Sequence, residues 1–79
     1  MNLVVQLCEF NRPRILDDGT RETHVVYVED TERSPRARYS YQAFSTKASA
    51  KAYAEGIQAG LKLLNGNKNE VPVLISDAV

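Results

Sequence analysis

The sequence predicts an α+β fold of the order β-β-β-α-β, a two-layer sandwich in which a largely antiparallel sheet is covered on one face by a single helix. Three stretches rich in alternating and β-branched residues come first, one long stretch with helical periodicity follows, and a short apolar stretch comes last. With 79 residues, the chain has the length of one small domain, which we expect to span residues 1–79.

The first predicted strand covers residues 2–10, with Leu3, Val5 and Leu7 on one face and Val4 and Cys8 among those on the other. Arg-Pro-Arg at 12–14 interrupts it because proline has no N–H for a central ladder, and pairing resumes at 15–16. Asp-Asp-Gly-Thr at 17–20 is typical of a turn, since its glycine accepts a positive φ.

The second predicted strand covers 23–29 and the third covers 36–44, with a polar connection between them. In the second strand, Val26 and Val28 lie opposite Val25 and Tyr27. In the third, alternation predicts one face made of Ala37, Tyr39, Tyr41 and Ala43 and another made of Arg36, Arg38, Ser40 and Gln42. The last strand covers 71–76, and Pro72 predicts that it lies at a sheet edge.

The helix is predicted over 47–64, capped by Ser45 or Thr46 and ended at Asn65-Gly66. Its large apolar residues fall on one arc and are expected to pack on the sheet: Ala50, Tyr53, Ala54, Ile57, Leu61 and Leu64.

A second arc of the helix, the small-residue arc, is centred on Ala52, Gly56 and Gly60, with Ala48 and Ala59 beside them, and is interrupted only by Ser49 and Leu63. Two glycines inside a helix cost about 1 kcal/mol each relative to alanine, so we expect something to offset that cost. Three interpretations remain open. The arc packs closely on the chain's own sheet, or Ala52, Gly56 and Gly60 form a contact with a partner or a second copy, or the arc has no specific role.

The composition excludes several classes of protein. Ten basic residues balance ten acidic ones, so no net field favours nucleic acid or an anionic membrane. The single cysteine, Cys8, excludes an intrachain disulfide and favours the cytoplasm, and no apolar run approaches the ~20 residues of a membrane span. No metal-ligand spacing or phosphate-binding loop occurs, so we expect no cofactor and no metal.

A catalytic site would have to use Cys8 and the only histidine, His24, which could lie on neighbouring strands. Nothing in the sequence orients such a base, and a cysteine in an apolar strand usually behaves as a small buried hydrophobe. We therefore expect no catalytic residues and no enzymatic activity.

The arginines suggest a binding surface, because all six lie before residue 39. Arginine and tyrosine are enriched where proteins contact each other, and the candidate partner-binding residues are Arg33, Arg36, Arg38, Tyr39 and Tyr41. The same residues could bind an RNA or DNA backbone. However, residues 1–44 carry six arginines and seven acidic residues, which also fits a solvated, salt-bridged hairpin rim.

The segment YSYQAFSTKASAKAYAEGIQAGLKLL, with a strand, a Ser-Thr cap and an Ala-rich helix containing Tyr53 and Glu55-Gly56, resembles small orphan proteins of bacteriophages and mobile elements. These include anti-CRISPR and other counter-defence inhibitors. The resemblance implies a compact, non-catalytic protein in the host cytoplasm that sterically blocks a host protein or nucleoprotein complex.

Our leading hypothesis is a non-enzymatic interaction module with a protein or nucleoprotein partner, and the resemblance implies that it is such an inhibitor. One alternative is a homo-oligomer, at its simplest a homodimer, that holds a small anionic ligand such as a nucleotide between subunits. Another alternative is a nucleic-acid-binding domain.

Overall fold

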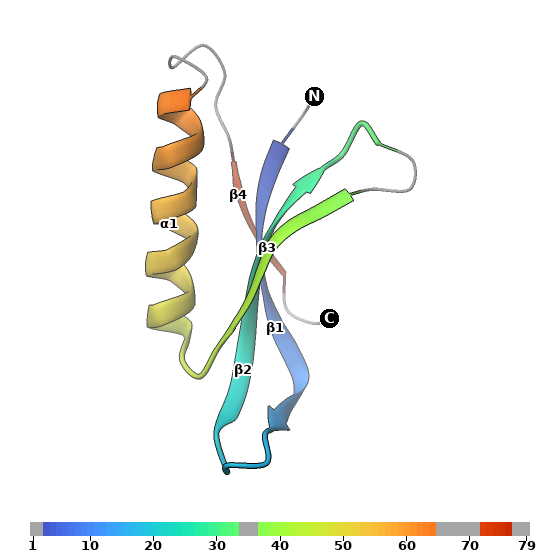
Figure 1. Cartoon of the computed structure of the whole chain (residues 1–79), viewed down its shortest axis with the longest axis vertical. Helices are drawn as coiled ribbons and strands as arrows, with labels where there is room; N and C mark the ends of the chain where they lie inside the picture. The colour runs from blue at the N-terminus through green and yellow to red at the C-terminus, as the bar shows by residue number, and fades with distance from the viewer. Residues whose placement is uncertain (1–2, 34–36, 65–71, 77–79) are drawn as a thin grey trace.

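The computed structural model describes residues 3–33, 37–64 and 72–76. Its elements follow the predicted order: β1 (Leu3–Ile15), β2 (Arg21–Asp30), β3 (Ala37–Phe44), α1 (Lys47–Leu64) and β4 (Val73–Ser76). The helix runs along one face of the sheet, and no helix of the described residues lies on the other face (Figure 1). The predicted α+β two-layer fold is therefore confirmed.

The sheet has the strand order β3-β2-β1-β4. The first three strands pair antiparallel as a meander, whereas β4 joins β1 in parallel, from Val5 opposite Val73 to Cys8 opposite Ser76. A parallel neighbour needs a crossover connection, and α1 is part of that connection. The Val5 N–H donates to the Pro72 carbonyl at 2.9 Å. The last strand thus lies at an edge, as Pro72 predicted.

The hairpin of β1 and β2 extends beyond the N-terminal end of α1 (Figure 1). Residues 10–13 of β1 lie opposite Thr23 alone, which confirms the interruption around Pro13. Pairing resumes at Arg14 opposite Glu22, one residue earlier than predicted, and continues with Ile15 opposite Arg21. In the turn, the Thr20 N–H donates to Asp18 Oδ1 at 2.8 Å. Hydrogen bonds from the Thr20 side chain and backbone lower the pKa of Asp18, and Gly19 has a φ of 87°.

The helix begins after Thr46, one of the two predicted caps. Thr46 Oγ1 accepts the Ser49 N–H at 3.1 Å, and the Thr46 carbonyl accepts the Ala50 N–H at 3.2 Å. The side-chain bond satisfies one of the free N–H groups at the helix start. The predicted end at Asn65-Gly66 lies outside the described residues.

The larger core lies between α1 and the sheet, and we call it the helix-side core. Its buried members are two residues each from β1, β2 and α1, namely Val5, Leu7, Val26, Val28, Ala50 and Ala54. Partly buried residues from β1, β3, α1 and β4 pack around them, namely Leu3, Phe44, Tyr53, Ile57, Leu61 and Val73. Because the two helical residues are fully buried alanines, the helix backbone approaches the sheet closely.

The prediction that Leu64 packs on the sheet is wrong, since its side chain is 84% exposed. The ends of β2 and β3 nearest the last turn of α1 bend away from the helix (Figure 1). The sheet therefore does not follow the helix as far as Leu64.

Candidate functional site

An extra residue in β3 decides which side chains share a face of the sheet. Val26 pairs with Gln42 and Val28 with Tyr39, so Ser40 and Tyr41 together lie opposite one residue of β2. Ser40 has a φ of 56°, in the left-handed region that residues other than glycine seldom adopt. This β-bulge reverses the alternation of side chains along β3.

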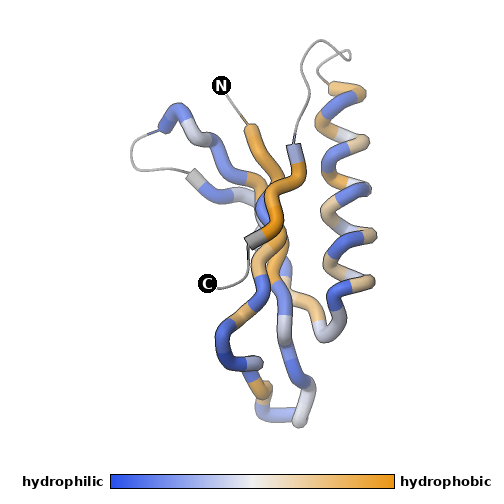
Figure 2. Tube along the Cα trace, turned by 180° about the vertical axis from the view of Figure 1, so that it is seen from behind, coloured by the Kyte–Doolittle hydropathy of each residue, from blue (hydrophilic) through white to orange (hydrophobic). Residues whose placement is uncertain are grey.

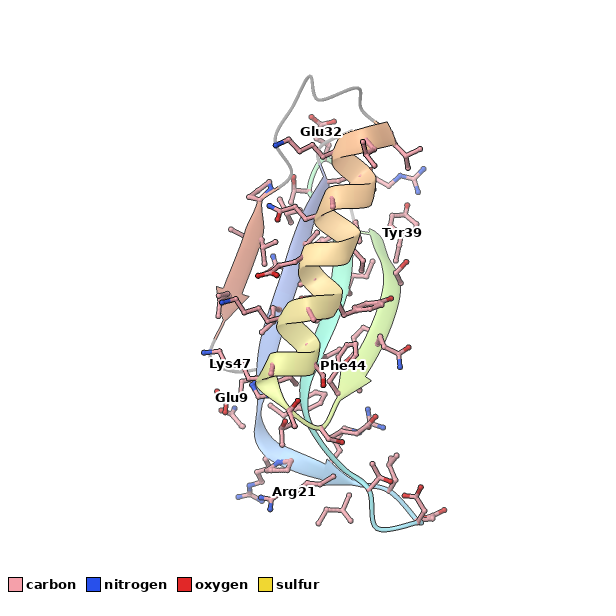
Figure 3. The ribbon with its side chains drawn as sticks, turned by 90° about the vertical axis from the view of Figure 1, so that its left-hand side faces the viewer. Glu9, Arg21, Glu32, Tyr39, Phe44 and Lys47 are labelled. Carbon is pink, nitrogen blue, oxygen red and sulfur yellow. The ribbon has the colours of Figure 1, made fainter. Side chains whose placement is uncertain are left out.

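The predicted face of β3 that contained both Tyr39 and Tyr41 is wrong for this reason. Arg38 pairs with Glu29 and shares with Tyr41 the face away from α1, which we call the uncovered face. Tyr39 pairs with Val28 of the helix-side core, and Figure 3, viewed from the helix side, shows it on β3 beside the helix.

Tyr27 is buried in the centre of the uncovered face between two side chains from β3. Its ring stacks on Tyr41 with centroids 5.7 Å apart and planes inclined by 13°, and Arg38 Cζ lies 4.8 Å from its centroid. Both distances fall in the range of favourable ring and cation–π contacts. Tyr41 and Arg38 remain about half exposed, so they are held in place yet open to solvent.

Glu29 of β2 forms an ion pair with Arg38. Arg38 Nε lies 3.4 Å from Glu29 Oε2, and the Glu29 side chain is almost fully buried. A buried carboxylate needs charged or hydrogen-bonding partners to offset the loss of its hydration. Arg38 therefore balances a buried negative charge while its own side chain stays 54% exposed.

Cys8 and Tyr27 meet inside the uncovered face. Cys8 Sγ donates a weak hydrogen bond to Tyr27 Oη at 3.9 Å. Burial, followed by this hydrogen bond, raises the pKa of Tyr27 from 10.0 to about 12. The phenol of Tyr27 therefore keeps its proton to a more alkaline pH than a solvent-exposed tyrosine does.

Cys8 and His24 do not form a nucleophile–base pair. Cys8 packs with Val25 and Tyr27 on the uncovered face, whereas His24 pairs with Phe44 of the helix-side core. Instead of a thiol, the His24 ring contacts the Thr23 hydroxyl, with Oγ1 and Nδ1 2.7 Å apart.

The five predicted partner-binding residues therefore separate. Arg38 and Tyr41 share the uncovered face, while Arg33 Nη1 donates to Tyr39 Oη at 3.4 Å elsewhere on the surface. Arg36 lies outside the described residues. The sequence missed Tyr27 and Glu29, since their roles depend on the register that the bulge at Ser40 creates.

The small-residue arc of α1 does not pack on the sheet. Ala52, Gly56 and Gly60 are exposed, and a Cβ added to either glycine would meet nothing within 4 Å. The interpretation that this arc packs closely on its own sheet is therefore wrong. Contact with another molecule remains a prediction.

Within the described residues, no group of three or more His, Cys, Asp or Glu side chains could hold a metal ion. No helix among them is both long and apolar enough to cross a membrane. Comparison of the chain with models of protein families, with curated proteins and with solved structures found no match.

Replacing Arg38 by alanine should lower the free energy of unfolding by about 1–2 kcal/mol, because it removes the cation–π contact and a partner of a buried carboxylate. Arg14→Ala is the matched control, since Arg14 is 57% exposed and lies 3.9 Å from Glu22. That exposed pair should contribute less than about 0.5 kcal/mol. Urea denaturation compares the two variants, and equal losses would contradict the role of Arg38.

The raised pKa of Tyr27 should make stability fall between pH 10 and about 12. In this window the unfolded chain releases the phenol proton while the folded chain keeps it, so rising pH favours unfolding. Below pH 10 the contribution is fully present. Tyr27→Phe should remove this part of the pH dependence, measured by urea denaturation at several pH values. Parallel pH profiles for the variant and the wild type would count against the assignment.

Gly56→Ala and Gly60→Ala should each stabilise the chain by about 0.5–1 kcal/mol, because alanine restricts the unfolded backbone and favours a helix. The open space around both positions leaves room for the added methyl group. Thermal unfolding measures the change. A lower melting temperature in either variant would show that the arc is packed against something within the chain.

Proposed function

We propose that this chain is a non-enzymatic interaction module whose uncovered face binds a protein partner through Arg38 and Tyr41. The observation that carries the proposal is the geometry of these two side chains, which are half exposed but held by Tyr27 and Glu29. Ordering arginine and tyrosine in advance reduces the entropy lost on binding, and these residue types dominate the binding energy of protein interfaces.

The charge around Arg38 favours a protein over a nucleic acid. Its guanidinium already faces the carboxylate of Glu29 at 3.4 Å, so a phosphate would approach a pair with little net charge. A planar guanidinium beside a tyrosine ring suits a partner that offers a carboxylate or backbone carbonyl next to apolar surface.

The finer proposal, that the module sterically blocks a host defence protein in the cytoplasm of an infected cell, rests on the resemblance of residues 39–64 to phage-encoded orphan proteins. It requires no catalysis, because covering a surface is enough to inhibit. The uncovered face would be the blocking surface.

Site-specific photocrosslinking tests the proposal. Tyr41 is replaced by a photoreactive phenylalanine analogue, and the same analogue at Lys51, an exposed position on α1, serves as the control. We expect one protein to be captured at position 41 and not at position 51. Capture of the same set of proteins at both positions would contradict a specific surface.

The captured protein is then purified and its affinity measured with point variants. Arg38→Ala and Tyr41→Ala should each weaken binding about 30-fold or more, the loss of about 2 kcal/mol that defines a central contact. Arg14→Ala should bind like the wild type. Unchanged affinity in both of the first two variants would refute the uncovered face as the binding surface.

A further inference from the structure

The two edges of the sheet differ in how they are protected. β3 carries a bulge at Ser40 and the charged side chain of Arg38, two features that discourage another strand from pairing. β4 has neither: Val73–Ser76 contains no charge and no proline, and its pairing with β1 is regular. Among the described residues, no strand lies on its outer side.

The backbone of β4 offers a defined set of hydrogen-bonding groups at this edge. Pro72 accepts from Val5 of β1, so residues 72 and 74 direct their backbone groups toward β1. Because these directions alternate along a strand, the N–H and C=O of Val73 and Ile75 point outward.

The side chains of β4 are apolar on both faces. Leu74 pairs with Gln6 on the uncovered face and is 43% exposed, while Ile75 pairs with Leu7 on the helix side and is 62% exposed. In Figure 2 this strand appears as one of the most hydrophobic parts of the trace. β4 is short, but exposed apolar residues along an edge that lacks a charge and a bulge leave that edge available to pair with another strand.

We propose that β4 pairs antiparallel with β4 of a second copy of this chain, around a two-fold axis through Leu74. This register places Leu74 opposite its own copy on the uncovered face and Val73 opposite Ile75 of the other copy on the helix side. The outward N–H and C=O groups of Val73 and Ile75 then bond each other, and Leu74 takes the closely spaced position without such bonds.

Self-complementarity is the reason for choosing a second copy as the occupant. The register matches apolar side chains on both faces and leaves every outward backbone group of Val73 and Ile75 paired, without burying a charge. The interface is short, and stable complexes bury about 1,200–2,000 Å². The dimer should therefore dissociate readily, with a dissociation constant on the order of 100 μM.

The dimer is independent of the proposed partner surface. Arg38 and Tyr41 lie on β3, at the opposite edge of the sheet from β4. Failure of either proposal therefore leaves the other intact.

Sedimentation equilibrium over a range of concentrations tests the dimer. Leu74→Lys and Leu74→Glu should each be monomeric, because the axis brings like charges face to face, and mixing the two variants should restore a dimer. Leu64→Lys is the control, since Leu64 is 84% exposed and lies on α1 rather than on a strand; it should dimerise like the wild type. A monomeric wild type at about 1 mM would overturn the proposal. So would a dimer that both Leu74 variants leave intact.

Amide hydrogen exchange of the wild type provides a readout without substitutions, in case the Leu74 variants lose β4. Protection of the Val73 and Ile75 amides should rise with protein concentration, because these N–H groups point outward. The Leu74 amide faces β1 and serves as the internal reference. Equal concentration dependence at all three amides would reject this register.

Discussion

A single helix can cover only one face of a sheet, so the side chains of the strands themselves have to shield the other. Cys8 and Val25 are buried on the uncovered face although no described helix lies above them. The long side chains of Arg38 and Tyr41 lie across Tyr27 and exclude water from the centre of this face. The residues that complete the core are therefore the same ones that any approaching molecule meets first.

Much of the fold could be predicted because it depends on local patterns. Alternation located the strands, a 3.6-residue period located α1, and Pro72 located the edge. The faces of β3 could not be predicted in this way, since nothing in Arg-Tyr-Ser-Tyr-Gln marks Ser40 as the extra residue. One inserted residue shifts the register of β3 between the two sides of the bulge. The pairing of Arg38 with Glu29 depends on this shift and was therefore also beyond sequence reasoning.

Small residues on α1 lie in two different environments, buried against the sheet or exposed, and their size alone does not predict which. Ala50 and Ala54 are fully buried and allow the helix to lie close to β1 and β2. Gly56 and Gly60 lie on another side of the same helix and contact none of the neighbouring elements closely. Packing among the described residues thus does not offset the cost of two flexible residues in a helix. The position of an arc relative to the sheet, rather than its composition, decides whether it belongs to the core.

The parallel pairing of β1 with β4 has a consequence for the order of folding. β2, β3 and α1 follow β1 in sequence, and their contacts close short loops, whereas Val5 pairs with Val73, which comes much later in the sequence. Contacts at such separation form late, because most of the chain must already be ordered to offset the entropy of closing the loop. A ribosome adds roughly 5–20 residues per second, so β4 is synthesised several seconds after β1. During that time β1, which is apolar on both faces, is the edge strand of the sheet and is open to pairing with another chain. Pairing with β4 then covers this edge of β1.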